Sequence, residues 1–175
     1  LNDDIYQLIE EADLNPEQEA KLERELGRQY HLITRDDRLD TVAKDIVRHF
    51  LGRGFVGKAM VVSIDKATAL RMFDKVKLHW VADLAKTQKE LGELAYSPVE
   101  GGMTAEQARR EVRMAELKQR LNVLTTTDMA VIVSPGQNEI QQMQKLGLDI
   151  EPHRKRMNES NPGLDEKFKD TQDPL

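Results

Sequence analysis

A short apolar run that passes directly into a helical pattern constrains the fold of this chain more than any other feature. Residues 59–64 are nearly all apolar, which is typical of a parallel strand buried on both faces. After Asp65 and Lys66, apolar side chains recur at helical spacing from Leu70 to Leu84. A strand that leads straight into a helix is half of a βαβ unit, and ligands bind at the carboxyl ends of such strands.

Further helical patterns surround this segment. The clearest covers residues 38–50, where apolar side chains recur at i, i+3, i+4 and i+7. Two long, mostly polar helices are predicted over residues 66–95 and from residue 104, with a Pro- and Gly-rich breaker between them. A second apolar run, residues 129–133, ends at Ser134 and precedes another helical pattern. This run is a second strand candidate.

These patterns predict an α/β fold with a partial parallel sheet flanked by helices. Residues 1–35 are acidic and helical in pattern, which predicts a helical linker or arm. Residues 36–175 would form the domain that holds the sheet. Within this domain, residues 66–127 include a long helical insertion between the two strands, because the helices there are polar over most of their surface.

Composition narrows the possible functions. The 175 residues carry a net charge of −5, which argues against a wholly basic nucleic-acid domain but allows local phosphate contacts. Cysteine is absent, so disulfides and thiolate sites are excluded, and a cytoplasmic setting fits. No apolar run is long enough to span a membrane. The basic cluster at residues 153–156 is predicted to be a solvated loop. The chain begins with Leu1 and ends without a closing element, so we expect a piece of a larger protein.

Motifs for nucleotide binding, metal binding and nucleophilic catalysis are missing. Residues 52–57 match G-x-G-x-x-G in spelling, but they follow a helix and precede a strand, the reverse of a dinucleotide site. Asp36, Asp37 and Asp40 suit the positive start of a helix better than a metal site. No serine lies in a G-x-S-x-G elbow. The histidines are dispersed and do not predict a metal site: His31, His49, His79 and His153.

Polar residues follow both strand candidates. Ser63 and Lys66 come at the end of the first, and Ser134 and Asn138 follow the second. Hydroxyls, a lysine and the free N–H groups of a helix start suit a phosphodiester backbone. Ordinary helix capping needs similar residue types at the same places. Both interpretations therefore stay open on the residues alone.

Two segments carry a family resemblance. Residues 34–50 (TRDDRLDTVAKDIVRHF) and 57–70 (GKAMVVSIDKATAL) resemble the R subunit, the motor and nuclease subunit, of type I restriction endonucleases. The resemblance is to the start of its second RecA-like helicase domain. Residues 128–135, 147–154 and 168–170 are similar to later segments of that subunit.

The resemblance implies a parent protein that translocates duplex DNA with ATP and Mg²⁺ and cuts it as a type I site-specific deoxyribonuclease. It implies a cytoplasmic complex with modification and specificity subunits, and no membrane. The fold implied is a partial RecA-like parallel sheet. The first strand is similar to helicase motif IV, and this similarity implies DNA-backbone contacts at Ser63, Lys66 and Ser134.

The chain departs from the family in several missing motifs. The Walker A lysine, the Mg²⁺-binding acidic motif, the nuclease carboxylates and the arginine-bearing motif VI have no counterpart here. Phosphoryl transfer needs a phosphate cradle, a metal and a charge-stabilising group together. We therefore expect this chain alone to bind neither ATP nor Mg²⁺ and to be inactive. The alternatives are a free-standing α/β nucleotide- or ligand-binding module, or a helical protein-interaction scaffold with residues 1–35 and 66–124 as its arms.

Overall fold

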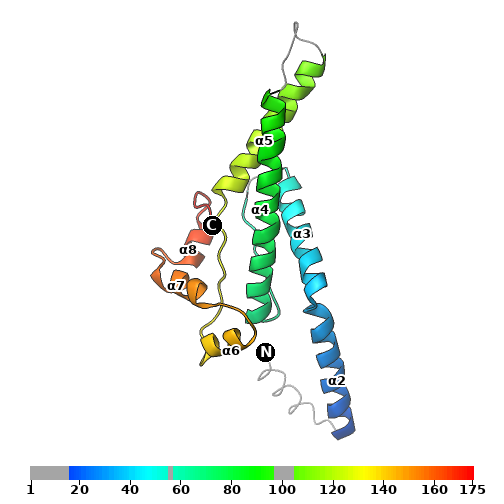
Figure 1. Cartoon of the computed structure of the whole chain (residues 1–175). Coiled ribbons are helices and arrows are strands. Elements are labelled where there is room, and N and C mark those ends of the chain that lie inside the picture. The colour runs from blue at the N-terminus through cyan, green and yellow to red at the C-terminus, as the bar shows by residue number, and fades with distance from the viewer. Residues whose placement is uncertain (1–15, 55–56, 97–104) are drawn as a thin grey trace.

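The computed structural model describes residues 16–54, 57–96 and 105–175, and every regular element in these ranges is a helix. Figure 1 shows α4 in the middle of the molecule, with α2 and α3 on one side and the short helices α6, α7 and α8 on the other. The helices, in chain order, are α2 (Pro16–Ile33), α3 (Asp36–Gly52), α4 (Lys66–Tyr96), α5 (Ala105–Thr126), α6 (Glu139–Lys145), α7 (Glu151–Glu159) and α8 (Leu164–Lys169).

The apolar stripe of α3 packs against α4, and the two helices run in the same direction. Leu39 and Ala43 are buried with Met72, and further along α3 Val47 is buried with Trp80. The helix predicted over residues 38–50 is confirmed, but its stripe covers another helix rather than a sheet. Two polar pairs repeat the same register: Lys75 Nζ to Asp36 Oδ1 at 2.8 Å, and His79 Nε2 to Asp40 Oδ1 at 2.9 Å.

Helices α4 and α5 form an antiparallel hairpin, as Figure 1 shows. Leu117 of α5 and Thr87 of α4 are buried. The two long helices predicted from the sequence are confirmed, because their observed bounds match the predicted ones closely. Two ion pairs fix the direction, since the residue number on α4 falls as that on α5 rises: Arg113 Nη2 to Glu90 Oε1 at 2.7 Å, and Arg120 Nη2 to Asp83 Oδ1 at 2.8 Å.

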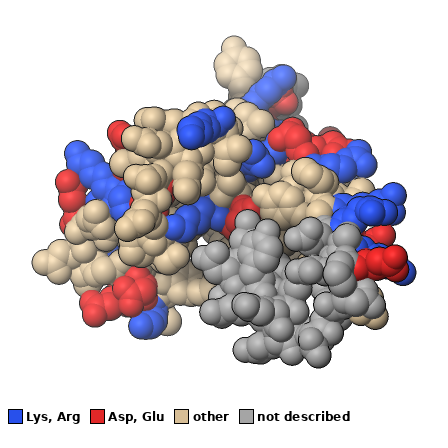
Figure 2. Space-filling view, turned by 90° about the horizontal axis from the view of Figure 1, so that it is seen from below, with Lys and Arg blue, Asp and Glu red and all other residues tan. Residues whose placement is uncertain are grey.

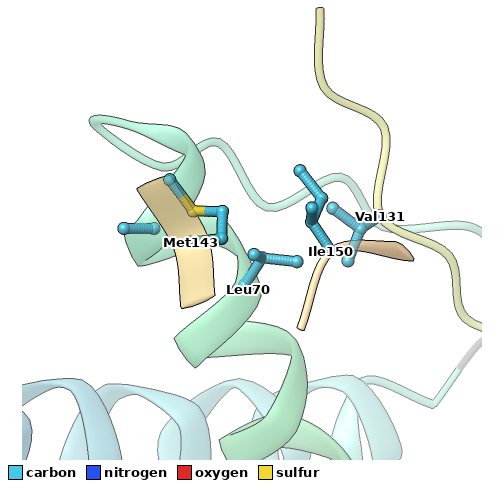
Figure 3. Packing of buried hydrophobic residues seen from close by; sticks show 5 residues of the cluster. Leu70, Val131, Met143 and Ile150 are labelled. Carbon is cyan, nitrogen blue, oxygen red and sulfur yellow. The ribbon is translucent and has the colours of Figure 1, made fainter. Parts of the chain in front are cut away.

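A separate apolar core lies where α4 begins. Leu70 of α4 packs with Val131, Met143 of α6, and Ile150, which directly precedes α7. Figure 3 shows these four side chains pointing toward one another from four different segments. Leu70 and Ile150 are almost completely buried, at 2% and 1% exposure. This core packs α6 and the residue that precedes α7 against the first turns of α4.

The predicted α/β fold is wrong. In the described residues there is no strand, and residues 59–64 and 129–133 run as extended chain without forming a sheet (Figure 1). The RecA-like parallel sheet implied by the family resemblance is therefore also not observed. An apolar run favours an extended, partly buried segment, but a sheet also needs hydrogen bonds between segments distant in sequence. The described residues form no such ladder between these two segments.

Candidate functional site

Three charged side chains meet where α4 and α6 begin, and we call Lys66, Glu139 and Arg154 the Glu139 cluster. The Glu139 carboxylate is buried, with the residue 8% exposed. Arg154 of α7 binds it with both arms of its guanidinium, Nε to Oε1 at 2.7 Å and Nη2 to Oε2 at 2.9 Å. Lys66 Nζ donates to Oε2 at 3.3 Å. Hydrogen bonding from Arg154 holds the pKa of Glu139 below its ordinary value, against the effect of burial and with help from Lys66.

Arginines of α7 also bind the extended segment that follows α5. Arg154 donates to the carbonyls of Val133 and Ser134, each at 3.1 Å. Arg156 Nη1 donates to the carbonyl of Met129 at 2.7 Å. These side chains supply donors that a neighbouring strand would otherwise supply. The expectation of a solvated loop at residues 153–156 is wrong, because this stretch is helical and both arginines are half-buried.

Asp65 caps the start of α4. Its Oδ1 accepts from the backbone N–H of Thr68 at 2.6 Å, the bond expected of a helix-capping aspartate. Its Oδ2 accepts from the hydroxyl of Tyr30 in α2 at 2.5 Å. Burial would raise the pKa of Asp65, but the bonds from Tyr30 and Thr68 outweigh it and the pKa is lowered. The same hydrogen bond, chiefly, raises the pKa of Tyr30. At Asp65 the capping interpretation is thus confirmed.

Two of the three residues expected to contact DNA, Lys66 and Ser134, are linked only indirectly, through Glu139 and Arg154. Lys66 lies against the loop that follows Ser134, since a Cβ added at Gly136 would lie 2.8 Å from Lys66 Nζ. The Ser134 side chain is exposed, and its carbonyl is held by Arg154. Ser63 is half-buried and has no hydrogen bond to any described residue. The sequence did not indicate Glu139 and Arg154, which join the other two.

Internal acidic partners compensate the positive charge around the Glu139 cluster. Lys66 and Arg154 share Glu139, and Arg156 forms an ion pair with Asp128. On the face drawn in Figure 2, basic and acidic side chains are interspersed rather than gathered in a patch of one sign. A phosphate group approaching this site would have to compete with a buried carboxylate for Lys66 and Arg154.

The described residues contain no group of three or more His, Asp or Glu side chains that could hold a metal ion. The carboxylates near the start of α3 bind neighbouring side chains instead. Asp36 and Asp40 bind Lys75 and His79 of α4. Asp37 forms an ion pair with Arg35 at 2.6 Å, and this hydrogen bond lowers its pKa.

Residues 59–64, which we call the apolar segment, expose large hydrophobic side chains next to this site. Met60, Val61 and Val62 are 72%, 48% and 84% exposed. Three consecutive apolar residues of this size are rarely exposed to water unless they form a binding surface. The ends of the segment are held in place, because Lys58 Nζ donates to the carbonyl of Lys167 at 2.5 Å and Asp65 caps α4.

No protein-family model, no curated protein and no solved structure matches the chain. The comparisons therefore identify no family. Across the described ranges, no helix combines the length and the apolar character needed to cross a membrane.

Proposed function

We propose that this chain is a helical protein-interaction scaffold that presents the apolar segment to a partner protein. The observation that carries this proposal is the exposure of Met60, Val61 and Val62 in a row. Large hydrophobic side chains exposed next to one another are typical of protein interfaces. The segment lies in the chain between the packed helices α3 and α4, next to the start of the core around Leu70.

Affinity capture with three versions of the full chain tests this proposal. We expect the wild-type chain to retain a specific protein that is lost when Met60 and Val62 are both replaced with lysine, because charge in an apolar contact is costly. Leu78→Lys is the matched control, since Leu78 is an exposed apolar residue of α4, at 65%. The proposal fails if the double variant retains everything that the wild type retains, or if Leu78→Lys has the same effect.

We propose as a second candidate that the chain belongs to the motor subunit of a cytoplasmic type I restriction enzyme. The sequence resemblance over residues 34–50 and 57–70 supports this, together with the proximity of Lys66 to the loop after Ser134. The parent would use ATP and Mg²⁺ on duplex DNA, with modification and specificity subunits as partners. This chain would contribute contacts to the DNA backbone and would have no ATPase or nuclease activity alone.

Duplex binding measured at several salt concentrations tests the second candidate. We expect weak affinity, with Kd on the order of 10⁻⁴ to 10⁻⁶ M, that falls steeply as salt rises. Replacing Ser63 and Lys66 with alanine should abolish binding, whereas Lys118→Ala on the exposed surface of α5 should not. The circular dichroism spectrum must stay unchanged, because Lys66 also contacts Glu139. Binding that survives the double substitution, or no binding by the wild type, would rule out this role for these residues.

A further inference from the structure

The peptide groups of the apolar segment have no partner among the described residues. In the part of the chain that the structure describes, no backbone N–H or C=O of residues 59–64 forms a hydrogen bond. Extended chain with free peptide groups is a template for pairing with another extended chain. The same residues expose apolar side chains, which add a packing surface. Hydrogen bonding and packing therefore both favour a second extended chain as the binding partner.

We propose that the occupant is a second copy of this chain, whose own apolar segment pairs with the first in antiparallel orientation about a two-fold axis at Val61. This deepens the proposed scaffold function and rests on it. Two-fold pairing of identical surfaces is the commonest form of oligomer. Each copy would supply donors and acceptors for the peptide groups of the other.

Charge at the ends of the segment favours the antiparallel orientation. Lys58 precedes the segment and Asp65 follows it, and residues 59–64 carry no charge. Parallel pairing would place Lys58 beside Lys58 of the second copy, and like charges directly opposite are destabilising. Antiparallel pairing avoids this contact, because with Val61 at the axis Lys58 lies opposite the uncharged Ile64 of the second copy.

The position of the axis follows from the exposed side chains. In a two-fold antiparallel pair one residue must lie opposite its own copy, because side chains alternate with a period of two. With Val61 at the axis, Met60 lies opposite Val62 of the second copy, and Val62 lies opposite Met60. The two most exposed side chains of the segment, at 72% and 84%, then cover each other.

A single cysteine tests this register, because the chain has no cysteine of its own. Directly opposite residues have Cα atoms about 4.5 or 5.5 Å apart, within the range that a disulfide can bridge. We expect Val61→Cys to form a covalent dimer several-fold faster than Leu78→Cys under mild oxidation. Val62→Cys should be slower than Val61→Cys, because residues 62 of the two copies lie diagonally, about 7–8 Å apart. Faster linkage at 62 than at 61 would overturn the register.

Sedimentation of the cysteine-free chain gives a readout independent of disulfide chemistry. We expect a concentration-dependent monomer–dimer equilibrium that Val62→Lys shifts to monomer and Leu78→Lys leaves unchanged. A wild-type chain that stays monomeric at every concentration, or that forms open-ended aggregates, would overturn the proposal. If the chain is monomeric yet captures a protein through Met60 and Val62, the two-fold pairing fails and the scaffold function stands.

Discussion

Replacing Trp80 with alanine is expected to destabilise the chain by about 3–5 kcal/mol, the usual cost of emptying a large aromatic site in a core. Trp80 is 7% exposed and lies where three helices meet. Its ring packs with Val47 of α3 and Leu124 of α5, and its centroid lies 5.7 Å from that of Phe50. Unfolding in urea should be followed by far-ultraviolet circular dichroism, because Trp80 is the only tryptophan of the chain.

Trp80→Phe is the matched control for this loss. The indole N–H donates to the carbonyl of Leu124 at 2.9 Å, and phenylalanine removes this bond while it keeps most of the apolar ring. We expect Trp80→Phe to cost about 1–3 kcal/mol, since it leaves a buried carbonyl without its donor. If Trp80→Ala lowers the free energy of unfolding by no more than about 1 kcal/mol, the packing of α3, α4 and α5 does not depend on this side chain.

Local periodicity was sufficient to predict the long helices. The stripe from Leu39 to Phe50 needs only the spacing of apolar residues along one segment, and α3 has nearly the predicted bounds. The same holds for α4, which ends at Tyr96, and α5, which begins at Ala105; the predicted breaker between them lies outside the described residues. Periodicity identified an apolar face on each helix, but it did not say that α3 would cover α4 rather than a sheet.

Strand pairing could not be predicted, because it depends on partners distant in sequence. The apolar runs at 59–64 and 129–133 do become extended chain, yet neither forms a ladder with described residues. Arg154 and Arg156 instead donate hydrogen bonds to the carbonyls of Met129, Val133 and Ser134. These arginines lie on α7, a helix that we did not predict because the sequence after Ile150 is polar.

The candidate site was predicted only in part, because it too depends on contacts between residues distant in sequence. Lys66 and Ser134 both stood out as polar residues at the ends of apolar runs, and the loop after Ser134 does reach Lys66. In the sequence, Glu139 is indistinguishable from an ordinary acidic residue in the first turn of a short helix, where a negative charge is favoured by the helix dipole. Its burial between Lys66 and Arg154 depends on the packing of α4, α6 and α7, which no local pattern reports.

Replacing Glu139 with alanine is expected to destabilise the chain by about 3 kcal/mol or more. The substitution removes the shared partner of Lys66 and Arg154 and leaves two partly buried cations beside each other, which is the costly way to break a buried ion pair. Urea unfolding at neutral pH measures the loss. Glu111→Ala, at an exposed carboxylate of α5, is the control and should change stability by less than about 0.5 kcal/mol.

The pH dependence of this loss separates an ionic contribution from lost packing. Because the pKa of Glu139 is lowered in the folded chain, its stabilising effect is fully present above the unfolded-state value of about 4.3 and is lost as the pH falls through the folded-state pKa. The difference in unfolding free energy between the wild type and Glu139→Gln should therefore be largest near neutral pH and shrink below about pH 4. Glutamine keeps the size of the side chain but not its charge, so a difference that stays constant down to acid pH would contradict an ionic role for Glu139.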